Sequence, residues 1–326
     1  MLHVCLCFAD FSGDYYKRAL VTAASVFANT ASPVCLHVVH DDTLDPEAAR
    51  RFNALADGRG KQVQLHNAQK VPEDIERQMP RAINRGSLYR LMLPEILPCE
   101  RVLYLDCDIV CECDVFEVLS QDIGDCFMGA TRFGKERVPY FVKRQGLDAS
   151  RYINSGVLLL NLDKLRRDMP NFIATLFNAI KEYDGKVTDQ EALNIVFNKR
   201  PDAFFFMPEA YNFRIWQKDH AALPLSDYAG KILHFSGRKP WEQFSHASIH
   251  YWKYHSALFP DDKVFERIIT LPSYEYAHLC AFMLRARFAR RLVRRLYECR
   301  EKGLFKTLFD RMTQGSGESR PGAKRR

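Results

Sequence analysis

The sequence predicts an α/β protein with a mainly parallel central sheet, and two observations lead to this prediction. Apolar segments of strand length alternate with amphipathic segments of helical length between Leu2 and Phe235, as is typical of parallel sheets. The segment from Val102 to Leu105 is apolar at every position rather than at every second one. Such a run indicates a central strand that is covered on both faces.

The first element is a strand over residues 2–9, and a helix over residues 15–29 follows it, with apolar residues at helical spacing. The same patterns predict the elements that come after. A loop-rich aromatic stretch begins near residue 240, and helical spacing returns over residues 274–312. Further strands are expected at residues 34–39, 62–65, 102–105, 127–130, 156–161 and 231–235, and further helices at residues 46–56, 87–97, 169–183 and 189–197.

The composition is that of a folded protein without a membrane span. Of the 326 residues, 47% are hydrophobic and 12% aromatic, which excludes a disordered chain. No apolar stretch approaches the roughly 18 residues that cross a bilayer, so we expect a soluble or peripheral protein. The ten cysteines are expected to be reduced thiols in the cytoplasm, because no export signal is present. Cys107, Cys111 and Cys113 lack the paired spacing of a zinc site.

Asp106 and Asp108 follow directly after the apolar strand. On an extended chain this spacing places both carboxylates on one face, at the edge where open α/β sheets bind their ligands. Two neighbouring carboxylates repel each other unless a cation lies between them, and a hard divalent ion is the usual one. We therefore interpret the pair as a metal-diphosphate site. The alternative is that the pair caps a following helix or turn.

Four further blocks lie near predicted strand ends or helix starts, and each also has a purely structural interpretation. Arg90 suits a helix surface, Asn154 a turn, Asp189 a helix N-cap and His234 a buried core position. The blocks are Ser87-Leu88-Tyr89-Arg90-Leu91, Asn154-Ser155-Gly156, Thr188-Asp189-Gln190 and His234-Phe235-Ser236-Gly237-Arg238-Lys239-Pro240-Trp241.

Together with Leu103-Tyr104-Leu105-Asp106-Cys107-Asp108, and in this order, the blocks resemble glycosyltransferase family 8, the glycogenin-like and lipopolysaccharide sugar transferases. The resemblance spans about residues 2–241. It implies a GT-A nucleotide-diphospho-sugar transferase fold, here a catalytic domain over residues 1–245. It also implies that Asp106, Asp108 and His234 bind Mn²⁺, with Mg²⁺ as the alternative. Two carboxylates and one imidazole suit Mn²⁺ better than an all-oxygen site would.

The resemblance implies a UDP-sugar donor and assigns residues to it. Asp10 would meet the nucleoside, Ala9 would lie beneath the uracil, and Tyr15 or Tyr16 would supply a stacking ring. Arg90 would help to hold the nucleotide-sugar. Lys239, after the flexible Gly237, would contact the diphosphate as a point charge. The stretch Asp10-Phe11-Ser12-Gly13-Asp14-Tyr15 departs from the family's usual Asp-x-Asn-Tyr.

Residues for the sugar are implied in the same way. Asn154 would line the donor sugar pocket, and Asp189 and Gln190 would lie near the anomeric carbon. The family retains anomeric configuration. Because Gln190 is a weak nucleophile, we favour front-face attack by the acceptor hydroxyl over a double displacement. Residues 131–133 lack the carboxylate that some members place on the sugar, which leaves glucose and galactose both open.

The positive charge of the chain is concentrated at its carboxyl end. Residues 278–326 hold fourteen Lys and Arg against four Asp and Glu, whereas the whole chain carries +7. Over residues 278–312 an apolar stripe at helical spacing accompanies dense arginine, which suits an interfacial helix on anionic lipid. The alternative is a helix docked on its own domain. Nucleic acid is not expected as a partner, because no nucleic-acid motif accompanies the arginines. The final residues 313–326 are expected to be disordered.

These interpretations combine into one expected function. The chain is expected to be a retaining, Mn²⁺-dependent hexosyltransferase that moves glucose or galactose from UDP to a lipooligosaccharide core or similar glycan. Its helical region, residues 246–312, would place it on the inner face of a bacterial cytoplasmic membrane, near a lipid-linked acceptor. Two alternatives stay open: a nucleotidyltransferase, and a non-catalytic glycan-binding protein that docks on membranes with the same fold.

Overall fold

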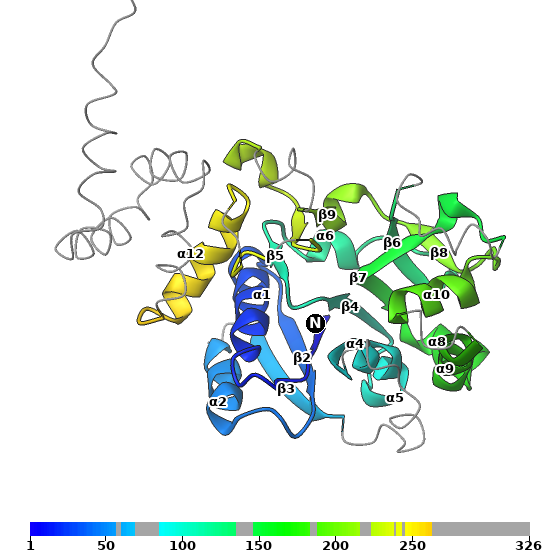
Figure 1. Ribbon diagram of the computed structural model, residues 1–326, viewed down its shortest axis with the longest axis horizontal. Coiled ribbons are helices and arrows are strands. Elements are labelled where there is room, and N and C mark those ends of the chain that lie inside the picture. Colours follow the sequence, from blue (N-terminus) through cyan, green and yellow to red (C-terminus); the bar gives the residue numbers. More distant parts are fainter. Residues whose placement is uncertain are drawn as a thin grey trace, which may run out of the picture.

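The computed structural model is built around a seven-stranded sheet with strand order β3-β2-β1-β4-β7-β6-β8 (Figure 1). The structure describes residues 1–56, 60–68, 85–134, 146–182, 188–215, 223–237, 239–242 and 245–262. Strands β1 to β4 run parallel, β7 is antiparallel to β4 and β6, and β8 is parallel to β6. The predicted α/β fold with a mainly parallel sheet is confirmed. The strands are β1 (Leu2–Cys7), β2 (Val34–His40), β3 (Lys61–Asn67), β4 (Arg101–Leu105), β6 (Met128–Arg132), β7 (Ile153–Asn161) and β8 (Phe204–Phe206).

Helices cover both faces of this sheet, and each face has its own apolar core. Strand β4 gives Val102 and Tyr104 to one core and Leu103 and Leu105 to the other, which is the double burial that its sequence predicts. Helices α1 and α2 pack on the second of these faces, and α8, α9 and α10 pack on the first (Figure 1). Their bounds are α1 (Tyr16–Asn29), α2 (Pro46–Leu55), α8 (Leu162–Asp168), α9 (Phe172–Glu182) and α10 (Asp189–Phe197).

A small second sheet has the order β5-β10-β9. Strand β5 (Ile109–Cys111) follows β4 after a short turn and pairs with β10 (Ile232–His234), which in turn pairs with β9 (Phe213–Arg214). His234 lies opposite Ile109 in this register, and the Phe235 amide donates to the Asp108 carbonyl at 3.0 Å. The small sheet thus brings a late segment of the chain to the end of β4.

Prolines explain two differences from the predicted helices. The helix expected at residues 87–97 is divided into α4 (Arg85–Tyr89), a 3₁₀ turn (Arg90–Met92) and α5 (Leu93–Ile96), because the Pro94 ring cannot follow the carbonyl of Arg90 in a continuous helix. The helix expected from residue 169 starts instead at Phe172, and a separate α8 precedes it. The residue before Pro170 avoids helical backbone, and Met169 indeed ends α8 at φ −138° and ψ 62°.

The aromatic stretch after residue 240 was expected to be loop-rich, and this is wrong for helix α12 (Ser248–Leu258). The face that the helix buries mixes aromatic residues with the polar Ser248 and His255, and the apolar Ala257 is exposed. The helix therefore lacks the clean apolar stripe that reveals a helix in sequence. It packs beside α1, where Asn29 Nδ2 donates to the Tyr254 hydroxyl at 2.8 Å.

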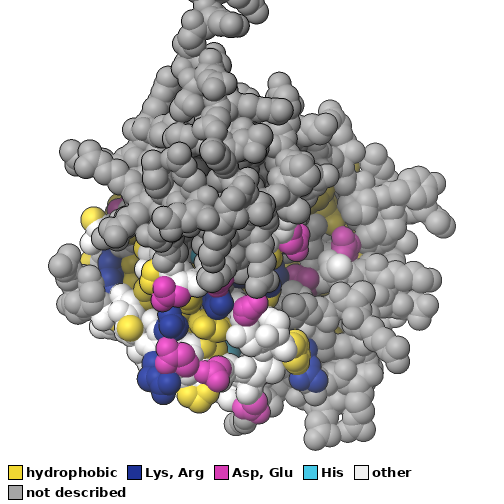
Figure 2. All heavy atoms as spheres, turned by 60° about the vertical axis from the view of Figure 1, so that its left-hand side comes forward, with side chains coloured by type: hydrophobic (Ala, Val, Ile, Leu, Met, Phe, Trp, Pro, Cys, Tyr) yellow, Lys and Arg dark blue, Asp and Glu magenta, His cyan; other side chains and the backbone are white. Residues whose placement is uncertain are grey.

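The basic segment over residues 278–312 and the tail over 313–326 lie outside the described residues. Within the described part of the chain, no helix combines the length and the apolar character of a membrane span. Where described residues are visible on the face turned forward in Figure 2, acidic and basic side chains are interspersed. On α2, for example, Glu47 pairs with Arg50 at 2.8 Å and with Arg51 at 3.0 Å.

Candidate functional site

Asp106 and Asp108 lie in a turn rather than on an extended strand. Strand β4 ends at Leu105, and the chain turns through residues 106–108 before β5 begins. The expectation of an extended chain at this point is therefore wrong, because β5 must leave the large sheet to pair with β10. Cys107 still points away from its neighbours, into the apolar core on the α1 face. The turn brings the two carboxylates together at the end of β4.

His234 joins this pair from the end of β10. Its Nε2 lies 3.4 Å from Asp108 Oδ1 and 3.8 Å from Asp106 Oδ2, and one ligand atom from each of the three residues lies within 4.8 Å of the others. The imidazole is 3% exposed and Asp108 is 8% exposed. The structure thus brings together the three residues that the sequence proposes as metal ligands.

Asn212, just before β9, determines which nitrogen of His234 faces the carboxylates. The Gly156 amide donates to Asn154 Oδ1 at 3.1 Å, so the Asn212 atom at 2.7 Å from that same oxygen must be its NH₂ group. Asn212 therefore turns its carbonyl oxygen to His234 Nδ1, 2.8 Å away. Nδ1 must carry the proton, and the Nε2 lone pair points to Asp106 and Asp108.

This donor set fits a divalent cation. Burial lowers the pKa of His234, so the ring is neutral, and a lone pair facing two carboxylates is repulsive unless a cation lies between them. Asp108 Oδ1 is buried and makes no hydrogen bond to the described residues, as expected of an atom reserved for a ligand. A histidine that donates its other N–H to a fixed oxygen is the usual orientation of a metal ligand.

Gly156 on β7 has no side chain, and this allows His234 and Asp106 to approach each other. A Cβ at this position would lie 2.2 Å from His234 Cε1 and 2.9 Å from Asp106 Oδ2. The Gly156 carbonyl also accepts from the Asp106 amide at 2.9 Å. Any larger residue would displace the imidazole or the carboxylate.

Arg90 connects the metal cluster to the residues proposed for the sugar. Its buried guanidinium lies 3.0 Å from Asp106 Oδ1 and 3.2 Å from Asp189 Oδ2. It also donates to the Ser155 carbonyl at 3.0 Å and lies over the Tyr104 ring. The helix-surface interpretation of Arg90 is therefore wrong, because its buried guanidinium pairs with the buried Asp189 and with the partly exposed Asp106.

Asn154, Asp189 and Gln190 lie together at the start of β7 and of α10. Asn154 Nδ2 donates to Gln190 Oε1 at 2.8 Å, and the Ser155 amide donates to the same oxygen at 3.2 Å. The N-cap of α10 is Thr188, which forms a capping box with Glu191, so Asp189 is the first helical residue and its carboxylate is free to face Arg90. Burial raises the pKa of Asp189, and the charge of Arg90 opposes this.

A pocket of about 190 Å³ opens beside the cluster, at the end of β1. Gly86 allows α4 to approach β1 closely, because a Cβ there would lie 2.9 Å from Phe8 Cα. Four residues proposed for the nucleotide or the metal line this pocket: Tyr15, Arg90, Asp106 and Asp108. Its complete lining is Cys7, Phe8, Tyr15, Gly86, Ser87, Arg90, Tyr104, Asp106, Cys107 and Asp108.

The other residues proposed for the nucleotide, Ala9, Asp10, Gly237 and Lys239, do not line this pocket. Asp10 holds the start of α1, because its carboxylate accepts from the amides of Asp14 and Tyr15 at 3.0 and 2.7 Å. Ala9 is buried beside it. Lys239 contacts the Asp108 carboxylate and donates to the Phe235 carbonyl at 2.9 Å, and Gly237 is exposed between them.

Asn212 and Gly156 are the site residues that sequence reasoning missed. Asn212 lies in an ordinary Tyr-Asn-Phe stretch with no motif. Gly156 belongs to the block around Asn154, but the sequence gives no sign that its missing side chain is what matters. Only the closeness of β7, β9 and β10 at this edge shows the role of either residue.

Solved structures share this fold. A galactosyltransferase, LgtC, solved with donor and acceptor sugar analogues, matches with a TM-score of 0.64 at 21% identity, covering 82% of this chain and 99% of that one. GlyE of Streptococcus pneumoniae matches with a TM-score of 0.59 at 19% identity, covering 82% of this chain and 64% of that one. The fold is the GT-A fold of glycosyltransferases.

The sequence comparisons add the family. The model of glycosyl transferase family 8 matches residues 6–245, and the chain belongs to this family. Members of this family are glycosyltransferases. Among relatives, GlyE is 26% identical over 75% of this chain, and a Haemophilus influenzae putative glycosyltransferase is 25% identical over 82% of it. The chain spans 59% of the length of GlyE and 81% of the Haemophilus protein.

Proposed function

We propose that the protein is a retaining, Mn²⁺-dependent hexosyltransferase that moves glucose or galactose from a UDP-sugar to a hydroxyl of a lipooligosaccharide or similar glycan. The observation that carries the proposal is the convergence of Asp106, Asp108 and the neutral Nε2 of His234. These residues would hold the ion, and Mg²⁺ is the alternative to Mn²⁺. The ion supplies positive charge to the leaving UDP.

The residues around the cluster support a nucleotide-diphosphate at this position. Lys239 reaches Asp108 from a segment that contains the exposed Gly237, so its ammonium can turn to a diphosphate as a second positive group. Tyr15 and Arg90 line the adjacent pocket, where we place the nucleoside and the start of the sugar. Ala9 and Asp10 lie at the end of β1 and would form the inner wall, although the Asp10 carboxylate is engaged by α1 amides.

The geometry around Gln190 favours front-face attack. In a double displacement Gln190 Oε1 would have to donate electrons to the anomeric carbon, yet this oxygen already accepts from Asn154 Nδ2 and the Ser155 amide. Two donors lower its nucleophilicity. We therefore propose that the acceptor hydroxyl attacks on the face of the leaving UDP, and that a diphosphate oxygen takes its proton. Asp189 would stabilise the positive charge that develops at the sugar ring.

The proposed acceptor is lipid-linked, and this rests on the sequence of residues 278–312. Their apolar stripe and dense arginine suit attachment to an anionic membrane surface, and an enzyme held there would meet lipid-anchored glycans on the inner face of a bacterial cytoplasmic membrane. LgtC, which shares the fold, forms a complex with donor and acceptor sugar analogues, and this fits a sugar acceptor. GlyE and the Haemophilus relative come from bacteria.

The test is release of UDP from UDP-glucose and UDP-galactose, each with Mn²⁺, with Mg²⁺ or with EDTA, and with UDP-xylose as a pentose control. We expect slow release from one hexose donor that EDTA abolishes and Mn²⁺ restores. The stereochemistry of a glycoside product, followed by NMR, reports retention. Release that is insensitive to EDTA would contradict the metal proposal, and a preference for UDP-xylose would contradict the hexose.

A further inference from the structure

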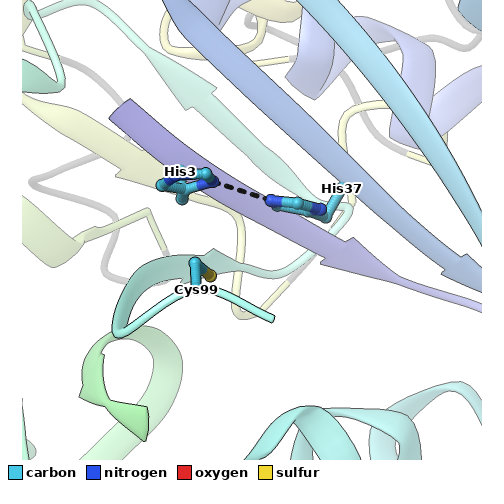
Figure 3. Close-up of side chains that lie close together, drawn as sticks. All are labelled: His3, His37 and Cys99. Carbon is cyan, nitrogen blue, oxygen red and sulfur yellow. Dashed lines mark hydrogen bonds between the residues drawn. The ribbon is translucent and has the colours of Figure 1, made fainter. Parts of the chain in front are cut away.

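A second cluster of possible metal ligands lies away from the site described above. His3 on β1, His37 on β2 and Cys99 before β4 place one ligand atom each within 4.8 Å of the others (Figure 3). Cys99 comes before β4, whereas Asp106 comes after it. The five residues of β4 span about 16 Å, so the two clusters lie at opposite ends of the strand.

The pairing of β1 with β2 explains why the two histidines meet. His3 lies opposite Cys35 in the parallel register, and His37 follows Cys35 by two residues, so both imidazoles lie on one face of the sheet. Their rings stack with centroids 5.2 Å apart, and His3 Nδ1 lies 2.9 Å from His37 Nε2. Figure 3 shows Cys99 below the two rings, on the connection that leads into β4.

His66 on β3 orients the central imidazole. Its Nε2 lies 3.0 Å from His37 Nδ1. When the His37 Nδ1 proton is donated to His66, the lone pair of His37 Nε2 points to His3 and Cys99. This is the arrangement of a metal-binding histidine, whose second nitrogen donates to a fixed acceptor.

We propose that His3 Nδ1, His37 Nε2 and Cys99 Sγ bind one Zn²⁺, with the fourth position open to water. Two imidazoles and a thiolate are the ligands that Zn²⁺ prefers, and they differ in kind from the carboxylate-rich cluster at Asp106. In a tetrahedral zinc site the ligand atoms lie roughly 3.3 to 3.8 Å apart, so small rotations of these side chains suffice. Binding displaces the Cys99 thiol proton to water and moves the His3 proton from Nδ1 to Nε2.

The exposure of the three residues suits a site that an ion can enter. His37 is 1% exposed, whereas His3 and Cys99 are partly exposed. The buried ring would anchor the ion, and the other two ligands would close over it from the surface. Bound zinc would join β1, β2 and the connection into β4, and would stabilise the folded chain by mass action.

The experiment titrates the full-length, reduced and chelator-treated protein with Co²⁺ as a spectroscopic substitute for Zn²⁺. A thiolate ligand gives a sulfur-to-cobalt charge-transfer band, which the carboxylate cluster cannot give. We expect the band at one equivalent of Co²⁺, its displacement by Zn²⁺, and a rise in the melting temperature with Zn²⁺. Cys99→Ser should abolish the band, and His37→Gln should weaken Co²⁺ binding at least tenfold.

Two control variants distinguish this site from Co²⁺ binding elsewhere on the protein. Cys126→Ser removes another partly exposed free thiol and should leave the band unchanged, and so should Asp108→Asn. Absence of the band in the wild-type protein, or its persistence in Cys99→Ser, would overturn the proposal. If His37→Gln binds Co²⁺ with the same affinity as the wild-type protein and shows the same band, then the thiol binds Co²⁺ adventitiously, and this result would also overturn the proposal. Because Cys99 is partly exposed, Cys99→Ser is expected to fold even if His37→Gln does not.

Discussion

His234 Nδ1 donates to Asn212 Oδ1 at 2.8 Å, and Asn212 Nδ2 donates in turn to Asn154 Oδ1 at 2.7 Å. One amide thus fixes both the tautomer of the proposed metal ligand and the position of the proposed sugar-binding residue. The Gly156 amide donates to Asn154 Oδ1, which must therefore accept from the Asn212 NH₂ group as well. The orientation of Asn212 thus follows from backbone geometry and does not depend on a bound ion.

Asn212→Ala is expected to weaken metal binding, because His234 would lose the acceptor that holds its Nδ1 proton. Loss of such a partner typically lowers metal affinity about 10- to 100-fold. The measurement is the Mn²⁺ concentration that gives half-maximal UDP release. Asn198→Ala is the control, because Asn198 is equally buried and bonds to the Asp148 backbone. It should lower stability without changing the Mn²⁺ requirement, and an equal change in both variants would contradict the role of Asn212.

Gly156→Ala is expected to abolish metal-dependent activity, because the added methyl would lie 2.2 Å from His234 Cε1. The matched control is Gly129→Ala on β6, where the nearest atom to the methyl would be the Met207 sulfur at 3.2 Å. We expect Gly129→Ala to be folded and to retain UDP release. Circular dichroism reports folding in both variants. Normal Mn²⁺-dependent activity in Gly156→Ala would show that His234 does not act from its position here.

Asp108→Asn is expected to remove Mn²⁺-assisted UDP binding, since Asp108 supplies the unpaired buried oxygen of the cluster. Isothermal titration calorimetry with UDP, with and without Mn²⁺, measures the difference. Asp163→Asn, on the exposed side of α8 with a surface pair to Arg166, serves as the control. If Mn²⁺ strengthens UDP binding equally in wild type and Asp108→Asn, then Asp108 is not a ligand.

Arg90→Met is expected to destabilise the fold by about 3–5 kcal/mol, because it leaves the carboxylate of Asp189 buried without its cationic partner and removes the same partner from the partly exposed Asp106. Urea denaturation at neutral pH measures this loss. The comparison is Arg50→Met on α2, which removes an exposed pair with Glu47 and should change the unfolding free energy by less than about 1 kcal/mol. Similar values for the two variants would argue against a buried charge cluster at Arg90.

Acid is expected to destabilise the protein through His255 on α12. Burial lowers the pKa of this imidazole to about 4, although Asp262 opposes the shift and Lys17 adds to it. A folded-state pKa below the unfolded value of about 6.5 means that the contribution to stability is complete above that pH and is lost as the pH falls toward 4. The loss is on the order of 2–3 kcal/mol. His255→Phe keeps a ring but cannot titrate, so its urea midpoint should fall less between pH 7 and pH 4.5. An unchanged dependence on pH would contradict this assignment.

The sequence predicted the large sheet and its central strand well, because their signals are local. Helix α10 begins and ends at the predicted residues, 189 and 197, because its apolar residues recur at helical spacing. Strand β4 is flanked by two apolar cores, and its unbroken apolar run reveals this directly. The three residues that the sequence proposes as metal ligands lie close together in the structure, and each belongs to a sequence motif.

The rest depended on contacts between distant segments. Strands β8 and β9 have three and two residues, which is too short for any periodicity. Asn212 acts on a histidine in another strand, and nothing in its own neighbourhood indicates this. The histidines of the proposed zinc site look like ordinary strand residues until the register of β1 and β2 places them on one face.

The reversed direction of β7 separates the parts of the site in a way that matters for redesign. Because β7 begins where β4 ends, Asn154, which we propose for the sugar, and its neighbour Ser155 lie on a different segment of chain from the carboxylates of residues 106 and 108. A protein engineer could vary residues 154 and 155 to test which sugar is accepted, and leave unchanged the turn of residues 106–108 that we propose to bind the cation. Gly156 should be kept in any such variant, because a side chain at this position would collide with His234 and Asp106.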